Sequence, residues 1–140
     1  MKRLFVTATN TDVGKTYATL QLIDALSDRG IRVGVCKPIE TGVNAIPLDA
    51  TALLDRVQRC NDAFASLTPQ DITAFTFSLP AAPYCADSDH TIQLSKIQEK
   101  IDELSSKCDF LIIEGAGGLM VPITSNYYMI DLANALEAMT

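Results

Sequence analysis

The segment at residues 9–16, TNTDVGKT, constrains this chain more than any other. It follows the apolar run at residues 4–6 and precedes a helix-like stretch, which is the strand, loop and helix order of a phosphate-binding loop. In such a loop Gly14 lets the backbone approach a phosphate, Lys15 brings charge to the β- and γ-phosphate oxygens, and the Thr16 hydroxyl can bind Mg²⁺. The usual pattern has glycine at its first position, where this chain has threonine. A chance GKT tripeptide in a turn is the alternative, but the flanking elements favour a nucleoside triphosphate site.

Length and composition fit one globular domain. The chain has 140 residues, of which 48% are apolar, enough to bury a core. The net charge of −6 argues against a nucleic-acid partner or an anionic membrane surface, because both need a basic face. No apolar stretch approaches the roughly 20 residues that span a bilayer, and the N-terminus lacks the apolar core of a signal peptide. We therefore expect a cytoplasmic protein.

The cysteines and the single histidine carry little functional signal. His90 lies in a polar stretch with no second metal ligand nearby, so we expect a solvated loop residue. The cysteines have neither zinc-site spacing nor a disulfide pattern, and we expect them to be reduced and mostly structural. They are Cys36, Cys60, Cys85 and Cys108.

The first part of the chain predicts a βαβ unit. The helical spacing of apolar residues after the phosphate loop ends at Gly30, a good C-terminal cap. Residues 31–36 alternate between apolar and other side chains, which predicts a half-buried strand that ends before Pro38. Residues 39–47 predict a loop, followed by a short helix that Asp49 would cap.

The second part predicts alternating strands and helices. Residues 72–77 suit a short strand, whereas the prolines of residues 79–83 exclude regular structure. Apolar residues step by three and four along residues 94–104, which predicts an amphipathic surface helix. The uninterrupted apolar run at residues 110–113 is typical of a central parallel strand, and residues 129–139 predict a last helix.

Three predicted strands end in chemically informative turns, TNTDVGKT, KPIETG and EGAGG. A parallel sheet brings such ends to one edge. We expect Lys15 and Lys37 to supply two cations there. Glu114 and Asp49 would supply acids that, with the hydroxyl of Thr16, hold Mg²⁺ against the phosphates. The arrangement predicts phosphoryl transfer.

These motifs, in this order, resemble the dethiobiotin synthetases, ATP-dependent ligases of biotin biosynthesis. The resemblance covers residues 7–16, KPIETG at 37–42, FSLPAAP at 77–83 and EGAGGLMVP at 114–122. Members of that family tolerate a residue other than glycine at the position of Thr9. The resemblance implies an α/β fold with a doubly wound, mostly parallel sheet of the P-loop NTPase type, here lacking its C-terminal strands. Residues 1–140 are then expected to be a single P-loop NTPase-like domain, the N-terminal part of a longer chain.

The resemblance also implies a reaction. CO₂ adds to one amine of 7,8-diaminononanoate as a carbamate, ATP phosphorylates the carbamate, and the second amine closes the ring. The products are dethiobiotin, ADP and phosphate. The family further implies that the full-length protein is a homodimer with its substrate pocket at the interface.

By the same resemblance the family's site residues map onto this chain. Lys37 and Lys15 would be catalytic, and Thr41 and Thr11 would contact the substrate. Thr16, Asp49 and Glu114 would hold Mg²⁺. The residues expected around ATP are Asp12, Val13, Gly14, Lys15, Thr16, Tyr17, Asp49, Glu114, Gly115, Ala116 and Gly117.

Several assignments have a structural alternative. Asp49 could serve only as a helix cap, and Lys37 could be a solvated lysine at a strand end. The glycines at 115, 117 and 118 could form no more than a tight turn. Glu40 is expected to be a surface residue.

Other functions also remain open. A nucleotide-driven switch that partitions or positions cargo shares the sheet and the Mg²⁺ site, but such proteins usually carry a second lysine early in the loop. Amidoligases of cobalt-corrin precursors need a glutaminase domain, for which this chain has no room. A fragment that binds phosphate without catalysis is the third alternative.

Overall fold

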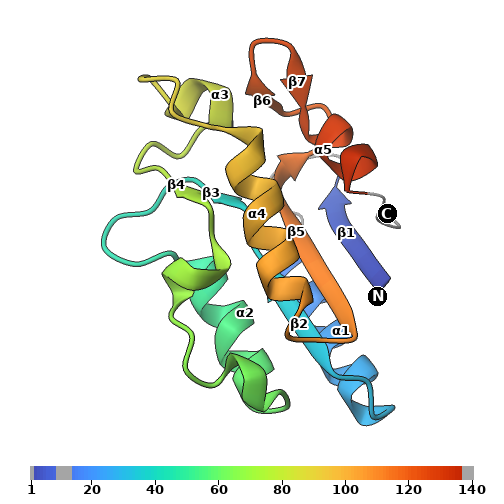
Figure 1. Ribbon diagram of the computed structural model, residues 1–140. Helices are drawn as coiled ribbons and strands as arrows, with labels where there is room; N and C mark the ends of the chain where they lie inside the picture. The colour runs from blue at the N-terminus through green and yellow to red at the C-terminus, as the bar shows by residue number, and fades with distance from the viewer. Residues whose placement is uncertain (1, 9–13, 137–140) are drawn as a thin grey trace.

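A computed structural model describes residues 2–8 and 14–136 of the chain. Its centre is a parallel three-stranded sheet in the order β1–β5–β2, made by β1 (Lys2–Ala8), β5 (Phe110–Gly118) and β2 (Val33–Cys36). In the register of this sheet, Val6 lies beside Glu114 and Cys36 beside Ile113. The carboxyl ends of all three strands therefore meet at one edge (Figure 1).

The central position of β5 follows from its sequence. Leu111, Ile112 and Ile113 are completely buried, which requires cover on both faces of the strand. The helices α1 (Lys15–Asp28) and α4 (Leu94–Ser105) lie against opposite faces of the sheet (Figure 1). The predicted α/β fold is thus confirmed.

The helices bury the faces that their apolar spacing predicted. Ile97, Ile101 and Leu104 of α4 are fully buried, and the opposite side of that helix is exposed. The helix α2 (Leu48–Gln58) packs against α1 and against β2. Among the described residues, no helix combines the length and the apolar character that crossing a bilayer requires.

Short elements connect these layers and surround the carboxyl edge of the sheet. A parallel pair of two-residue strands, a short helix and a hairpin lie near that edge (Figure 1). The short elements and the last helix are η1 (Asp62–Phe64), η2 (Pro69–Ile72), β3 (Ile39–Glu40), β4 (Phe75–Thr76), α3 (Pro83–Ala86), β6 (Pro122–Thr124), β7 (Tyr127–Tyr128) and α5 (Met129–Ala135).

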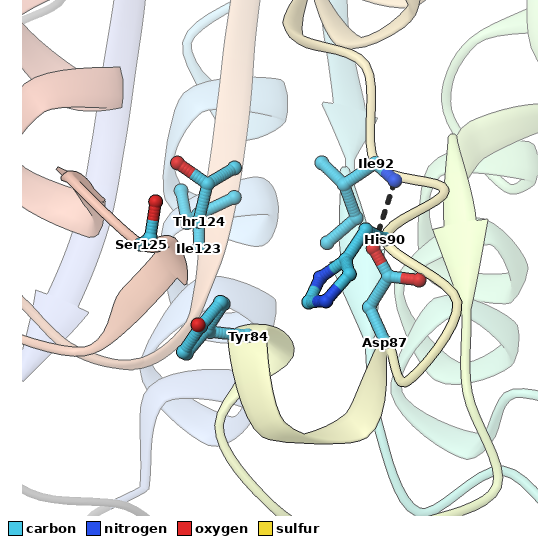
Figure 2. Close-up of a pocket in the computed structure, with 7 residues that line it drawn as sticks. All are labelled: Tyr84, Asp87, His90, Ile92, Ile123, Thr124 and Ser125. Carbon is cyan, nitrogen blue, oxygen red and sulfur yellow. Dashed lines mark hydrogen bonds between the residues drawn. The ribbon is translucent and has the colours of Figure 1, made fainter.

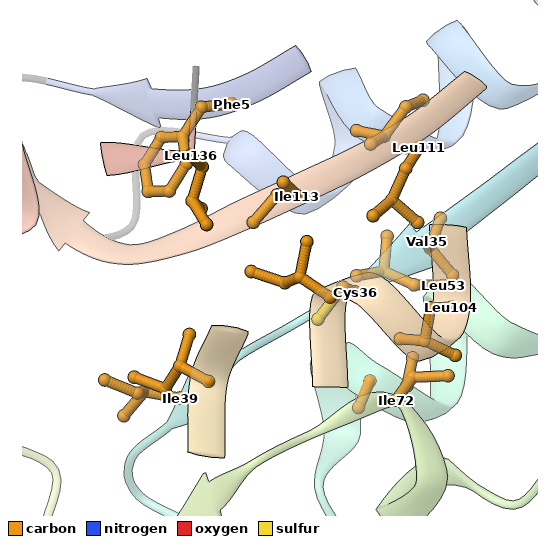
Figure 3. Packing of buried hydrophobic residues seen from close by; sticks show 14 of the residues in the cluster. Phe5, Val35, Cys36, Ile39, Leu53, Ile72, Leu104, Leu111, Ile113 and Leu136 are labelled. Carbon is orange, nitrogen blue, oxygen red and sulfur yellow. The ribbon is translucent and has the colours of Figure 1, made fainter. Parts of the chain in front are cut away.

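One continuous core joins the sheet to its helices. Figure 3 shows Phe5 beside Leu136 on one side of the cluster, and Cys36 near Leu53 of α2 and Leu104 of α4. Burial raises the pKa of the Cys36 thiol, which keeps the thiol protonated and unreactive. Cys36 is therefore a packing residue, as expected from the sequence.

The structure corrects several boundaries. The strand expected at residues 31–36 begins at Val33, and it is fully rather than half buried because β5 pairs with it and α2 and α4 pack on it. The loop expected at residues 39–47 contains β3. The expected strand at residues 72–77 shrinks to β4, since Ile72 ends a 3₁₀ turn.

Three further boundaries differ. Pro83 begins α3, where a proline needs no N–H partner, so the proline-rich segment is not wholly irregular. β5 continues beyond Ile113 to Gly118. The last helix ends at Ala135, and residues 137–139 of the prediction lie outside the described part of the chain.

Candidate functional site

A buried ion pair stands at the carboxyl ends of β2 and β5. Lys37 comes directly after β2, and its Nζ donates hydrogen bonds to Oε1 of Glu114 (3.0 Å) and to the carbonyl oxygen of Gly115 (2.9 Å). Both charged side chains are almost completely buried, at 4% and 1% exposure. Burying two charges costs desolvation that an apolar pair would avoid, so such a pair is poor evidence for stability and better evidence for function.

The phosphate loop reaches the same carboxylate from β1. Gly14 has a φ of +83°, which glycine adopts freely, and it precedes α1 as its N-cap residue. Thr16 in the first turn of α1 donates its hydroxyl hydrogen bond to Oε1 of Glu114 (2.9 Å). One oxygen of Glu114 therefore connects the first turn of α1 to the lysine at the end of β2.

The second oxygen of Glu114 is left without a partner. Oε2 is buried and has no hydrogen bond to any residue in the described part of the chain. A buried polar atom without a partner costs about 1–3 kcal/mol, so natural proteins usually supply a water, an ion or a ligand there. This oxygen marks a place where a bound group would be stabilised.

Asp49 completes the cluster from α2. Its Oδ2 lies 3.7 Å from Nζ of Lys37, and its side chain remains about half exposed. Asp49 does not cap α2 through its side chain, because Pro47 is the N-cap residue and no side-chain cap bond is made there. The capping alternative for Asp49 is thus wrong, and its carboxylate faces the lysine.

Thr16, Asp49 and Glu114 of this cluster line a hollow of about 260 Å³, which we call the strand-end hollow. An α-helix N-terminus with lysine and threonine on one side and two acids on the other suits a phosphate with a divalent cation. Tyr17, which sequence analysis placed near the phosphates, also lines it and is largely exposed. The residues around this hollow are Gly14, Lys15, Thr16, Tyr17, Asp49 and Glu114.

Thr41 lies apart from that cluster. It lines a second hollow of about 260 Å³, the Thr41 hollow, between the loop after β3 and the end of β5. Ala116 and Gly117 belong to this hollow, so β5 contributes to both sites. The remaining lining residues are Pro80, Ala81, Ala82, Pro83 and Val121.

The glycines after Glu114 continue β5 instead of forming only a turn. Gly115 packs so closely on Phe5 that an added Cβ would lie 3.0 Å from that ring. Gly117 has a φ of +73°, which an L side chain rarely adopts. Gly117 lines the Thr41 hollow.

Glu40 is the functional candidate that sequence reasoning missed. It was expected at the surface, but it is buried, and its carboxylate accepts hydrogen bonds from the backbone N–H groups of Asp49 and Ala50. Burial raises the pKa of the Glu40 carboxyl, although those two N–H groups pull the pKa down. Pro47 was the sequence signal that could have indicated this role. Because its side chain cannot accept a hydrogen bond from the first N–H groups of α2, the helix needs an acceptor from elsewhere in the chain.

A third hollow, of about 300 Å³, lies between α3 and β6 (Figure 2), and we call it the Tyr84–His90 hollow. The Tyr84 and His90 rings stack with centroids 5.9 Å apart. His90 is exposed, as expected from the sequence. The buried Asp87 accepts hydrogen bonds from the backbone N–H groups of Thr91 and Ile92 and from the Thr91 hydroxyl.

Residues 9–13 of the predicted phosphate loop are not part of the described chain. Thr11, Asp12 and Val13 fall in this segment, and their predicted contacts with substrate and phosphate remain predictions.

Comparison with known proteins gives a consistent result. A family described as an AAA domain matches residues 2–140. An ATP-dependent dethiobiotin synthetase BioD of Sulfurovum sp. (strain NBC37-1) is 55% identical over 137 residues, which cover 98% of this chain and 65% of that protein. Proteins of the same name from Wolinella succinogenes and Aquifex aeolicus are 40% and 39% identical over 99% and 94% of the chain, and over 64% and 57% of their own lengths. The chain thus spans less than two thirds of the length of these relatives.

Proposed function

The chain belongs to the AAA-domain family whose model matches residues 2–140, and we propose that the full-length protein is an ATP-dependent dethiobiotin synthetase. The observation that carries the proposal is the buried contact of Lys37 and Thr16 with one oxygen of Glu114 beside the phosphate loop. The relatives' names support the same activity.

The proposed reaction joins CO₂ to 7,8-diaminononanoate in three steps. One amine attacks CO₂ to form a carbamate and loses a proton. A carbamate oxygen then attacks the γ-phosphorus of ATP, forming a carbamic-phosphoric anhydride and releasing ADP. The second amine attacks the carbamate carbon, phosphate leaves, and the cyclic urea is dethiobiotin.

Each step places negative charge where this chain offers cations. The carbamate, the transferred phosphoryl group and the released phosphate are all anionic. Lys37 is fixed by its bonds to Glu114 and Gly115, so its ammonium group is already oriented when charge grows in the transition state. Lys15 lines the strand-end hollow at the start of α1, where it can approach the β- and γ-phosphates.

The donor set of the strand-end hollow fits Mg²⁺. Thr16, Asp49 and Glu114 offer a hydroxyl and two carboxylates, the hard oxygen ligands that this ion prefers, and Oε2 of Glu114 lacks a partner within the described residues. When bound, Mg²⁺ would supply charge neutralisation for the phosphates. These three residues would hold it.

The Thr41 hollow suits the organic substrate. Its lining combines the Thr41 hydroxyl with proline, alanine and valine side chains, which match an alkyl chain that carries polar groups. Because Ala116 and Gly117 continue the strand that carries Glu114, a substrate in this hollow would be next to the phosphoryl donor. Thr11, in the segment that the structure leaves out, is proposed to contact the carbamate.

One assay tests the function. Full-length protein is incubated with diaminononanoate, bicarbonate and Mg·ATP, and mass spectrometry detects the cyclic urea while a coupled assay measures ADP. We expect dethiobiotin and ADP in equal amounts, and none without the diamine. A switch ATPase would hydrolyse ATP without diamine, and a non-catalytic phosphate-binding protein would release no ADP. Either result would overturn the proposal.

The assembly and location are also proposed. Following the resemblance to the dethiobiotin synthetases, we propose a cytoplasmic homodimer of the full-length protein. Light scattering of the full-length protein tests the dimer, and a monomer that is fully active would contradict it.

A further inference from the structure

Glu40 is a buried carboxylate with both oxygens engaged at the start of α2. It is the last residue of β3 and is only 5% exposed. Its Oε2 accepts the N–H of Asp49 (3.0 Å), and its Oε1 accepts the N–H of Ala50 (2.9 Å). Glu40 therefore ties a strand at the site to the second and third residues of the helix.

The helix needs this acceptor because its own sequence supplies none. The first N–H groups of an α-helix have no partner within the helix, and a side chain at the N-cap normally accepts from one of them. Here the N-cap residue is Pro47, which has no side-chain acceptor. The negative charge of Glu40 also interacts favourably with the positive end of the helix dipole.

The bond to Asp49 has a consequence for the site. Glu40 fixes the backbone of Asp49 through a hydrogen bond to its N–H. The carboxylate of Asp49 stays half exposed, and within the described residues its one ion-pair partner is Lys37, whose Nζ lies 3.7 Å away. The backbone of this acid is thus held in place while its side chain remains open to the strand-end hollow. That combination suits an acid that must meet an incoming cation.

We propose that Glu40 is a positioning residue, which holds Asp49 at the strand-end hollow and thereby strengthens the binding of Mg²⁺ with nucleotide. This inference rests on the proposed function. Groups that orient a metal ligand commonly change metal affinity about 10–100-fold when they are removed. Glu40 acts through the main chain of the ligand instead of through its side chain.

The test compares Glu40 with a carboxylate that caps backbone N–H groups elsewhere. Asp87 is also buried and also accepts two backbone N–H bonds, but it lies at the Tyr84–His90 hollow. Full-length wild type, Glu40→Ala, Glu40→Gln and Asp87→Ala are titrated with Mg²⁺ in the presence of a non-hydrolysable fluorescent ATP analogue. Thermal unfolding of each variant is measured in parallel.

We expect Glu40→Ala to raise the half-saturating Mg²⁺ concentration about tenfold or more. Glu40→Gln keeps one acceptor oxygen and should show a smaller rise. Asp87→Ala should lower the Tm while leaving the half-saturating concentration within about twofold. An unchanged Mg²⁺ titration in Glu40→Gln and Glu40→Ala, with only the Tm lowered, would reduce Glu40 to a structural cap and overturn the proposal.

Two complications are separated by this design. If Glu40→Ala fails to fold, the Glu40→Gln titration decides alone, and a wild-type value there overturns the proposal. The readout is Mg²⁺-dependent nucleotide binding, so it does not require dethiobiotin to form. Failure of the proposed function would appear separately, as wild-type protein that binds Mg²⁺ with the analogue but makes no cyclic urea.

Discussion

The strand-end hollow and the Tyr84–His90 hollow are similar in size but differ in chemistry. Their volumes are about 260 and 300 Å³. Each is bordered by a buried carboxylate, Glu114 in the first and Asp87 in the second. Volume therefore does not distinguish the two hollows. They differ in whether the oxygens of the buried carboxylate have hydrogen-bond partners.

The two carboxylates differ in how their oxygens are used. Both oxygens of Asp87 accept hydrogen bonds from its own loop, so neither oxygen lacks a partner. Glu114 shares one oxygen between Lys37 and Thr16, while its other oxygen has no partner within the described residues. The comparison teaches that an incompletely satisfied buried charge is a better mark of a site than a larger cavity.

The largest expected effect is that of removing Lys37, the lysine paired with Glu114. Lys37→Ala in full-length protein should lower kcat for dethiobiotin formation about 10²–10³-fold, because a preoriented charge at the transition state is lost. It should also destabilise the protein by about 3–5 kcal/mol, since Glu114 is left buried and unpaired. Product formation by mass spectrometry and urea unfolding measure the two effects.

A double variant separates these two effects. Lys37→Met combined with Glu114→Met replaces the ion pair by apolar side chains, which should restore most of the stability without restoring turnover. Wild-type turnover in Lys37→Ala would contradict the assignment of that lysine.

The next largest effect is expected for Glu114, whose Oε2 has no partner within the described residues. Glu114→Gln keeps the shape of the side chain but removes its charge, and we expect the half-saturating Mg²⁺ concentration for nucleotide binding to rise by at least about tenfold. The measurement is a Mg²⁺ titration with a fluorescent ATP analogue, with Asp87→Asn as the control. Equal Mg²⁺ titrations for Glu114→Gln and wild type would remove the distinction between the two carboxylates.

A smaller effect is expected for Asp87, and on stability alone. Burial pushes its pKa up, but the hydrogen bonds from Thr91 and Ile92 outweigh burial and hold the pKa below the ordinary 3.8. When folding lowers the pKa of a carboxyl, its ionised form stabilises the folded state. This stabilisation is complete at a pH above the pKa of the unfolded chain, and it is lost as the pH falls through the pKa of the folded protein. Asp87→Ala should cost about 1–2 kcal/mol at neutral pH, and the cost should shrink below about pH 4. Urea unfolding of wild type and Asp87→Ala between neutral pH and about pH 3 tests this prediction. A destabilisation by Asp87→Ala that grew toward low pH would contradict it.

The smallest effect is expected for the exposed rings of the second hollow. Tyr84→Ala and His90→Ala should change dethiobiotin turnover by less than about twofold, as surface substitutions usually do. Steady-state kinetics of full-length protein measure this. A loss of turnover as large as that of Lys37→Ala would show that the Tyr84–His90 hollow takes part in the reaction. It would contradict the distinction drawn between the two hollows.

Local patterns were sufficient to predict the elements that carry the site. The apolar run at residues 110–113 identified the central strand, and the phosphate loop and KPIETG identified the functional turns at the ends of the other two strands. Because parallel strands present their carboxyl ends at one edge, the meeting of Thr16, Lys37 and Glu114 could be inferred from the order of elements alone.

The parts that were wrong depend on contacts between distant segments. Glu40 looks like a surface acid in its loop, and only the approach of α2 turns it into a buried acceptor. The polar-looking alternation before Cys36 gave no sign that β2 is covered on both faces, since that cover comes from helices elsewhere in the chain. The stacking of Tyr84 on His90, which has a φ of +53°, joins a helix to the loop that follows it and has no signal in the local sequence.

The position of β5 between β1 and β2 has a consequence for synthesis on the ribosome. The phosphate loop and Lys37 emerge early, but the strand that joins them is made some 77 to 98 positions later, as the spacing of the Lys37 and Thr16 bonds to Glu114 shows. Long-range pairing of this kind forms late and slowly. A nascent chain arrested before Phe110 should therefore be sensitive to protease whether or not ATP is present, and nucleotide should begin to protect the chain only after β5 has left the exit tunnel.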